Sequence, residues 1–267
     1  MPGKVRKCRK NQPFSIPSWP AAWLSTTSNK KPRTLTIKKT TLESPPGVDL
    51  LIEQPKKGYR YNQDPFHLFR FVRSRLEKGI CAPAGEALDL GTGVGILPLL
   101  LARALPGLNF TGLEIQSDLA DLAAANVKRN HLADRIRIIT DDYRETAKRH
   151  EFQNRFEFIV CNPPYYPAAA GRLNQCPQKR LARHEIAGDL DELLAAVSRF
   201  LKNRGTFFLI FPAERLSELF TKLQRVQLEP KELLFLHPRD SDRAATLLLA
   251  ARRYGSPGIT VGNPILI

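Results

Sequence analysis

Short apolar runs alternate with longer amphipathic stretches along the chain from about residue 85 onward. Runs with the composition of strands fall at 87–90, 109–114, 136–140, 156–161, 206–211, 233–237 and 246–251. Between most of them, apolar residues recur at helical spacing, as over 96–105, 118–130, 191–201 and 214–223. Strands and helices in alternation predict a parallel sheet with helices on both faces.

The last two strand runs differ from the others because no helix separates them. They are therefore expected to form a hairpin, which places one antiparallel strand in the sheet. The expected fold is α/β, with a doubly wound, mostly parallel, seven-stranded, Rossmann-like sheet and an antiparallel C-terminal strand. In such open sheets, ligands bind beyond the carboxyl ends of the strands where the strand order reverses. Functional residues are therefore expected just after the strand runs.

The first part of the chain lacks this periodicity and is rich in Pro, Ser, Lys and Arg. Segments of this kind bury too little apolar surface to become ordered. We interpret 1–41 as a basic, disordered tail and 42–267 as one domain, with regular structure starting near 48–53. A transit peptide and an upstream start codon that is not the true one are the alternatives for the tail.

The net charge of +15 favours a polyanionic partner such as RNA, but its distribution weakens that inference. Residues 1–45 hold ten Lys and Arg against one acid, Glu43, so they supply nine of the fifteen net charges and leave six for the rest.

The cysteines indicate neither a zinc site nor a disulfide framework, because none forms a CxxC pair or has a His partner at metal-ligand spacing. They are Cys8, Cys81, Cys161 and Cys176. No run of eighteen apolar residues suggests a membrane span. The expected protein has no metal and no membrane segment, and lies in the cytoplasm.

A glycine-rich turn follows the first strand run and leads directly into a helical stretch. It contains Asp89, Gly91, Gly93 and Gly95. Glycines let the backbone turn sharply and let a ligand approach main-chain N–H groups. The spacing G-x-G-x-G departs from the dinucleotide fingerprint G-x-G-x-x-G, and a purely structural turn is the alternative.

Carboxylates follow the next two strand runs. Glu114, at the end of the second run, can accept hydrogen bonds from ribose hydroxyls. Asp141 and Asp142 follow the third run, and a carboxylate there could accept a hydrogen bond from an adenine amino group. Either acid taken singly is more often a loop residue, but features after three successive strands are harder to attribute to chance.

The fourth strand run is followed by Asn162, Pro163, Pro164 and Tyr165. Two prolines remove two backbone donors, so the preceding carbonyls are left to project into the site. The Asn162 side chain adds another acceptor, and Tyr165 adds an aromatic face on which a flat substrate can stack. These four candidate catalytic residues predict a receptor for a planar NH2 group, and a rigid turn is the alternative.

The glycine turn and the carboxylates resemble those of the class I S-adenosylmethionine-dependent methyltransferases. The resemblance implies that Glu114 binds the cofactor's ribose and that Asp142, rather than Asp141, lies near its adenine. Asn162 to Tyr165 resemble the motif of methyltransferases that act on adenine N6, cytosine N4 or protein glutamine. Asn162 would then contact both cofactor and substrate.

A narrower resemblance covers about 42–267. The segments 58–64, 162–165, 182–185 and 263–267 are similar to those of the bacterial family that methylates N6 of the adenine beside the anticodon, adenine 37, in tRNA1(Val). This similarity implies that Tyr59 and Asp64 pack over the methionine end of S-adenosylmethionine. Arg183 and His184 are candidates for contacts to RNA phosphate or base, with a solvated helix N-terminus as the alternative. Residues 65–67 depart from the expected aliphatic pattern, which bears on fine specificity.

Three other functions compete with tRNA adenine methylation. A release-factor glutamine methyltransferase shares the Asn-Pro-Pro-Tyr motif, but residues 1–84 are too short and irregular for its helical N-terminal domain. A non-catalytic RNA-binding module is disfavoured by the intact glycines and by Glu114, Asp142 and Asn162. A nicotinamide oxidoreductase is disfavoured by the glycine spacing.

Overall fold

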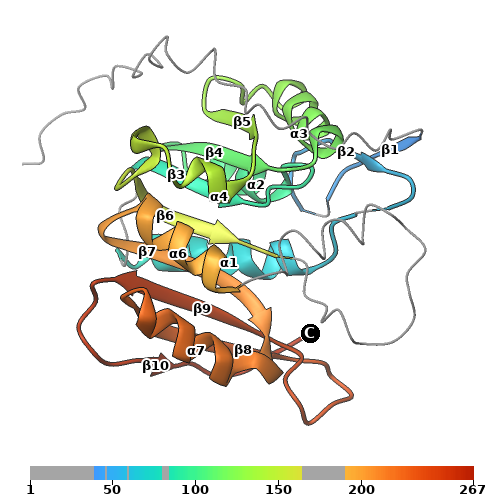
Figure 1. Cartoon of the computed structure of the whole chain (residues 1–267). Helices are drawn as coiled ribbons and strands as arrows, with labels where there is room; N and C mark the ends of the chain where they lie inside the picture. Colours follow the sequence, from blue (N-terminus) through green and yellow to red (C-terminus); the bar gives the residue numbers. More distant parts are fainter. Residues whose placement is uncertain (1–38, 46, 59, 80–83, 164–189) are drawn as a thin grey trace, which may run out of the picture. The chain divides into compact units, whose positions relative to one another are not determined.

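The computed structural model describes residues 39–45, 47–58, 60–79, 84–163 and 190–267 (Figure 1). All seven predicted strands are present in one sheet, in the order β5-β4-β3-β6-β7-β9-β8. Their bounds are β3 Gly85–Leu90, β4 Leu108–Glu114, β5 Ile136–Thr140, β6 Phe156–Cys161, β7 Leu201–Pro212, β8 Leu228–His237 and β9 Thr246–Arg253.

The predicted antiparallel hairpin is confirmed. Strand β9 pairs antiparallel with both β7 and β8. The pairings among the other central strands are parallel, in the order β5, β4, β3, β6 and β7. Two strands too short to show a periodic pattern, β10 (Thr260–Val261) and β11 (Ile265–Leu266), pair with the outer edge of β8. They bring the sheet from the expected seven strands to nine.

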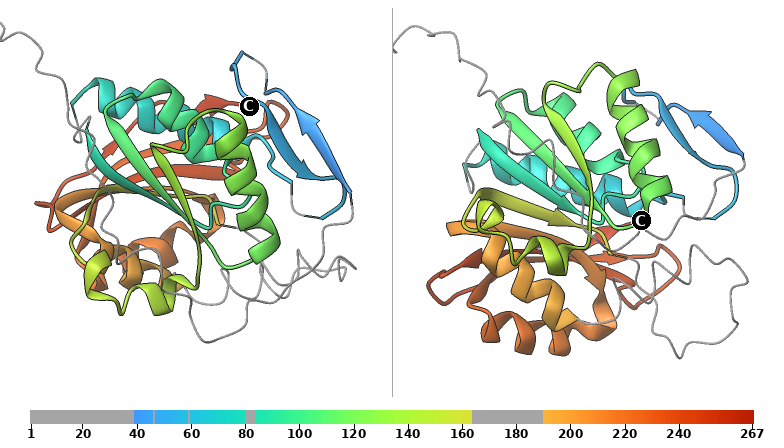
Figure 2. Two further views of the ribbon diagram at one scale, coloured as in Figure 1. Left: turned by 90° about the horizontal axis from the view of Figure 1, so that it is seen from above. Right: turned by 45° about the horizontal axis from the view of Figure 1, so that its top comes forward.

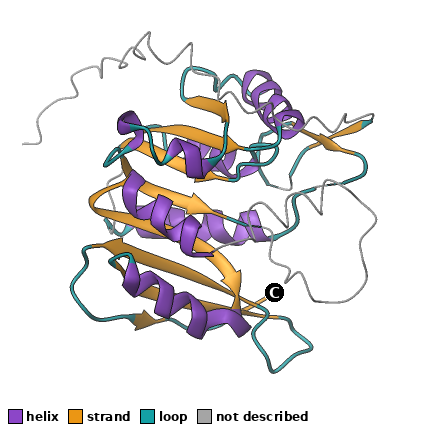
Figure 3. Ribbon diagram, viewed as in Figure 1, coloured by secondary structure: helices purple, strands orange, loops and turns teal. Residues whose placement is uncertain are grey.

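Helices cover both faces of the sheet, as the alternation of elements predicts (Figures 2 and 3). One face carries α1 (Asp64–Glu77) and α2 (Ile96–Ala104), while α3 (Ser117–Arg129) packs against β4 and β5. The other face carries α4 (Tyr143–Thr146), α6 (Leu190–Phe200) and α7 (Leu216–Arg225). Two short helices, η2 (His150–Phe152) and η3 (Ala213–Arg215), also lie in the described part of the chain, and η3 forms the first turn of the stretch predicted as one helix over 214–223.

Helix α1 was not predicted, although its buried residues have helical spacing. Leu68, Phe71, Val72 and Leu76 form its apolar face, and Pro65 occupies the first turn, where its missing N–H costs little. The pattern is interrupted by Arg75, which also faces the interior. Its guanidinium forms an ion pair with Glu232 of β8 and lies 4.3 Å from the Phe71 ring centroid.

A separate two-stranded sheet precedes α1. Strands β1 (Thr40–Glu43) and β2 (Ile52–Pro55) pair antiparallel, so within the described residues regular structure begins at Thr40, ahead of the expected 48–53. Two asparagines of the α3 region hold β2. Asn126 Oδ1 accepts from Glu53 N at 2.7 Å and its Nδ2 donates to Glu53 O at 2.8 Å. Asn130 makes the same pair of bonds with Leu51, at 2.9 and 2.8 Å.

The core is continuous across the central strands because both faces of the sheet are covered. Phe110, Phe158 and Phe208 are fully buried and meet edge to face, with centroid distances of 6.1 and 5.9 Å. Phe71 of α1 extends this row at 5.9 Å from Phe208. The packing ties the first helix to the strands that carry the site.

Neither a membrane span nor a metal cluster is found within the described residues. No helix there is long and apolar enough to cross a bilayer. Likewise, that part of the chain contains no group of three or more His, Cys, Asp or Glu side chains that could hold a metal ion.

Candidate active site

The predicted site residues that can be placed lie mainly at one edge of the sheet. Strand β3 pairs with β4 on one side and β6 on the other, so the chain order reverses at β3. The carboxyl ends of β3, β4, β5 and β6 point the same way, because these strands are parallel. Asp89, Glu114, Asp142 and Asn162 lie at or just after those ends. This is where ligands bind in doubly wound sheets.

The glycine turn has a backbone that other residues rarely adopt. The φ angles of Gly91, Gly93 and Gly95 are 73°, 57° and 82°. Gly95 caps α2, and a Cβ built on it would lie 3.3 Å from Cβ of Ala123 in α3. The turn is anchored to β4, since Gly91 N donates to Leu113 O at 2.8 Å.

Two buried carboxyl groups hold this turn in place. Glu114 is 3 % exposed, and its Oε2 accepts from Gly93 N at 2.8 Å while its Oε1 accepts from Gln116 N at 3.0 Å. Asp89 is 2 % exposed and accepts from Thr92 Oγ1 at 2.6 Å. Burial raises the pKa of Asp89 to about 7; the bond from Thr92 opposes this rise and the charge of Glu114 adds to it.

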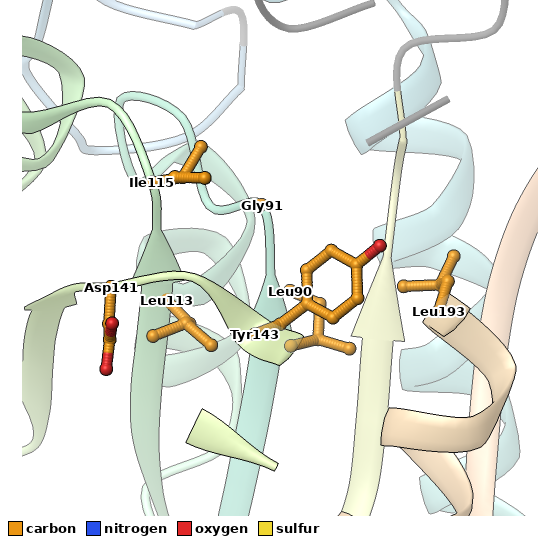
Figure 4. Close-up of a pocket in the computed structure, with 7 residues that line it drawn as sticks. All are labelled: Leu90, Gly91, Leu113, Ile115, Asp141, Tyr143 and Leu193. Atoms are coloured by element: carbon orange, nitrogen blue, oxygen red, sulfur yellow. The ribbon is translucent and has the colours of Figure 1, made fainter. Parts of the chain in front are cut away.

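The two acids after β5 have different surroundings. Asp141 is engaged within the fold: its Oδ2 accepts from Thr146 Oγ1 at 3.0 Å and forms an ion pair with Arg149. Its carboxylate points away from Gly91 and Ile115 (Figure 4). Asp142 caps α4 by accepting from Arg144 N at 2.9 Å, and its Oδ2 lies 2.7 Å from Nη2 of the same arginine. Both acids are thus engaged in contacts within the fold, and the choice of Asp142 as the adenine ligand stays a prediction.

A pocket opens between the strand ends and α6 (Figure 4). Its empty volume is about 340 Å³, open solvent included. The lining residues are mostly apolar: Leu90, Gly91, Leu113, Ile115, Asp141, Tyr143 and Leu193. Sequence reasoning did not select Ile115, Tyr143 or Leu193. Ile115 and Tyr143 directly follow acids at strand ends, which is a usable signal, whereas nothing near Leu193 marks it.

The candidate receptor for the amine, which starts at Asn162, follows β6 directly and lies beside the end of β3. Cys161, the last residue of β6, is fully buried, and its Sγ donates to Leu90 O at 3.3 Å. Burial and the nearby Asp89 carboxyl group raise the pKa of this thiol, which keeps it protonated. The next residues are Asn162, half-buried, and Pro163, buried. Pairing of β6 with β3 thus brings Asn162 to the reversal point.

Several predicted site residues lie outside the described part of the chain: Tyr59, Pro164, Tyr165, Arg183 and His184. Their roles stay predictions.

Asp64 is described and begins α1, where its Oδ2 accepts from Asn62 Nδ2 at 2.7 Å. Its predicted place over the cofactor is not tested by this contact. Nearby His67 is half-buried, and burial lowers its pKa, as for a structural histidine.

The strand order, the single antiparallel strand and the glycine turn ahead of Glu114 together define a class I methyltransferase fold. Solved structures agree: a predicted O-methyltransferase from Agrobacterium tumefaciens superposes with a TM-score of 0.54 at 17% identity, covering 68% of this chain and 80% of that one. TYW2 from M. jannaschii, solved in complex with AdoMet, gives 0.54 at 14% identity, covering 80% and 85%.

Sequence comparison identifies the family. The model of the methyltransferase small domain matches residues 70–226. A tRNA1(Val) (adenine(37)-N6)-methyltransferase from Shewanella putrefaciens is 32% identical over 62% of this chain and 68% of the relative. A protein of the same name from Porphyromonas gingivalis is 34% identical over 58% and 69%. The chain belongs to the methyltransferase small-domain family, and within it to the group that these relatives represent.

Proposed function

We propose that this methyltransferase transfers the methyl group of S-adenosylmethionine to N6 of an adenine in tRNA, and that the acceptor is adenine 37 of tRNA1(Val). The observation that carries the proposal is the position of Asn162 and Pro163, directly after β6 and beside the strand that leads into the glycine turn. The names of the relatives from Shewanella putrefaciens and Porphyromonas gingivalis support the acceptor.

The described residues fit S-adenosylmethionine. The glycine turn has the positive φ angles and the lack of Cβ atoms that allow a ligand to approach the backbone closely, and Glu114 lies directly beside it. The pocket next to Glu114 has mostly apolar walls, with Ile115, Leu113 and Leu193 among them, as a site for an adenine ring requires. When bound, S-adenosylmethionine supplies a methyl group on a positively charged sulfur, which is already strongly electrophilic.

Asn162 and Pro163 then have to orient an amine rather than supply a strong base. The side-chain oxygen of Asn162 and the carbonyl of Pro163 can accept the two amine hydrogens, which directs the nitrogen lone pair toward the methyl donor. The residues contribute mainly position and electrostatics. An adenine within a folded tRNA must also leave its stack to reach them.

The proposal is tested by incubating the full chain with S-adenosylmethionine carrying a labelled methyl group and tRNA lacking native modification, followed by nucleoside analysis. We expect N6-methyladenosine, mapped beside the anticodon of tRNA1(Val). If tRNA stayed unlabelled while the protein bound the cofactor, the acceptor would have to be sought in ribosomal RNA or in the glutamine of a release factor.

Replacement of Asn162 separates chemistry from cofactor binding. Asn162→Ala is expected to abolish transfer, because one of the two acceptors for the amine is lost, and to leave the Kd of S-adenosylhomocysteine nearly unchanged, because the glycine turn and Glu114 supply most of the predicted cofactor contacts. Asn154→Gly is the matched control, since Asn154 precedes β6 at the opposite edge of the sheet and has a φ of 50° that glycine tolerates. Preserved turnover in Asn162→Ala would refute the role of the amide.

A further inference from the structure

The pocket contains a buried hydroxyl group that the proposed chemistry does not use. Tyr143 is 8 % exposed, and its Oη has no hydrogen-bond partner among the described residues. The ring lies between Leu90 and Leu193 and lines the pocket, and the hydroxyl is directed toward the end of β6 (Figure 4).

A buried hydroxyl without a hydrogen-bond partner lowers the stability of the folded chain. A buried polar group without a partner loses about 1–3 kcal/mol of hydration that nothing replaces. Phenylalanine would fill the same space between Leu90 and Leu193 without that cost. The hydroxyl is therefore best explained by a ligand that supplies the missing partner when it enters the pocket.

The chemistry of the group restricts that ligand. Burial is the main cause that raises the pKa of Tyr143 above its ordinary value, so the phenol stays protonated at physiological pH and can act as a donor. Besides Gly91 and Asp141, whose carboxylate is paired with Arg149, the other walls are the apolar side chains Leu90, Leu113, Ile115 and Leu193. A flat ring that carries an acceptor nitrogen at its edge satisfies both the walls and the donor.

Two such rings could reach this edge of the sheet, the adenine of the cofactor and the adenine of the substrate. The lining residues come from the ends of β3 and β4, from the segment after β5 and from α6. Ile115 directly follows Glu114, and Tyr143 directly follows Asp142, so both belong to the half that carries the candidate cofactor ligands. Asn162 and Pro163, which we assign to the substrate amine, do not line the pocket.

We propose that the Tyr143 hydroxyl donates a hydrogen bond to a ring nitrogen of the cofactor's adenine and thereby helps the protein select an adenosine-containing cofactor. This inference rests on the proposed use of S-adenosylmethionine. The exocyclic amine of that ring donates hydrogen bonds, so its partner in this proposal is a carboxylate such as Asp142. The Tyr143 hydroxyl instead donates to a ring nitrogen.

The first experiment measures the Kd of S-adenosylhomocysteine by calorimetry for the full chain and for Tyr143→Phe. We expect a roughly two- to thirteenfold weaker Kd in the variant, which corresponds to about 0.5–1.5 kcal/mol for one neutral hydrogen bond. The melting temperature without ligand should stay equal or rise, because the variant no longer buries an unpaired hydroxyl. Tyr254→Phe is the matched control, since Tyr254 is half exposed at the end of β9.

The second experiment uses 1-deaza-, 3-deaza- and 7-deazaadenine analogues of S-adenosylhomocysteine, each of which lacks one ring nitrogen. One analogue should bind the unaltered chain more weakly than the parent compound does, and Tyr143→Phe should bind that analogue and the parent alike. Such coupling identifies the nitrogen that the hydroxyl contacts.

Equal Kd values for the chain and Tyr143→Phe, with no coupling to any analogue, would overturn the inference. So would an unchanged Kd for S-adenosylhomocysteine together with a raised KM for tRNA, which would assign the hydroxyl to the substrate base. If S-adenosylhomocysteine failed to bind even the unaltered chain, the proposed function itself would fail, and this outcome is distinct from the other two.

Discussion

Asp89 and Glu114 are buried carboxyl groups that meet the same glycine turn, yet they have different partners. Glu114 accepts from two main-chain N–H groups, those of Gly93 and Gln116. Asp89 accepts from the Thr92 hydroxyl and otherwise lies in an apolar interior, which raises its pKa to about 7. Charges that face it include Glu114, and the Cys161 thiol is a further titratable neighbour.

The raised pKa of Asp89 makes stability depend on pH. A carboxyl group whose pKa is higher in the folded than in the unfolded chain favours folding only while it is protonated. The free energy of unfolding should therefore fall as pH rises from about 4, the ordinary pKa of an aspartate, through about 7, the pKa of Asp89 in the folded chain. The slope for one such group is at most about 1.4 kcal/mol per pH unit.

Asp89→Asn is expected to remove this component, because the amide oxygen can still accept from Thr92 but carries no charge. Urea unfolding at a series of pH values between 4 and 8 measures the difference between the two proteins. Asp49→Asn serves as control, since the Asp49 side chain is fully exposed. Parallel pH profiles for the chain and Asp89→Asn would contradict the assignment.

At the residue scale, the sequence indicated which kinds of group end the strands but could not choose between neighbours. Asp141 and Asp142 are both acids after β5, and a resemblance alone favoured the second. In the structure Asp141 contacts Thr146 and Arg149, and Asp142 caps α4 and pairs with Arg144, so the choice between them stays a prediction. Both partners of Asp141 lie beyond the strand pattern, so periodicity could not reveal them.

At the scale of elements, Gly95 links the cofactor turn to the packing of α3. Its φ of 82° disfavours any side chain, and a Cβ there would press on Ala123 at 3.3 Å. Gly79 has a similar φ of 71° but no atom within 4 Å of such a Cβ. A side chain at Gly79 would therefore cause backbone strain alone, whereas one at Gly95 would also displace α3.

Gly79→Ala is expected to lower the free energy of unfolding by about 1 kcal/mol through backbone strain alone. Gly95→Ala should lower it by about 2–3 kcal/mol, because α3 must also shift, and should weaken binding of S-adenosylhomocysteine. Chemical unfolding and calorimetry measure the two effects. Equal losses in both variants would mean that α3 adapts without cost.

Elements with strong local patterns were predicted nearly to their ends, and elements defined by distant partners were not. Strands β5 and β6 match the predicted ranges, because their apolar runs are flanked by clear turns. Helix α1 was not predicted, because Arg75 interrupts its apolar face. The buried arginine is neutralised by an ion pair with Glu232, a distant residue in β8. Strands β10 and β11 depend wholly on the edge of β8.

At the scale of the whole molecule, charge is distributed unevenly between the basic segment 1–45 and the remainder of the chain. Nine of the fifteen net positive charges belong to that segment. Phosphate contacts by Lys and Arg release counterions, so affinity for RNA falls with salt in proportion to their number. The segment is therefore expected to strengthen tRNA binding without taking part in methyl transfer.

This expectation is tested with a variant in which the ten Lys and Arg of residues 1–45 are replaced by Ser. The dependence of log Kd for tRNA on log salt concentration should become shallower, by about 0.7–0.9 for each phosphate contact removed. The kcat at saturating tRNA should stay unchanged. An identical salt slope in the variant would show that the segment makes no phosphate contacts.

The sequence by itself determined the parts of this protein that depend on local chemistry. Alternating strand and helix patterns, glycines where φ is positive, and Asn-Pro-Pro after a strand can each be read without knowing what lies beside them. These patterns predicted a doubly wound sheet with an antiparallel strand, and the resemblance of the motifs to those of a known family implied a methyltransferase.

The contacts between these elements become known only from the tertiary structure. Strand pairing places β6 beside β3 and so brings Asn162 next to the glycine turn, and the packing of α6 brings Leu193 to Tyr143. A pattern along the chain records whether a side chain is buried, but not which distant residue it meets. The ion pair of Arg75 with Glu232 and the position of Leu193 beside Tyr143 are of that second kind, because they are set by the order and packing of the elements.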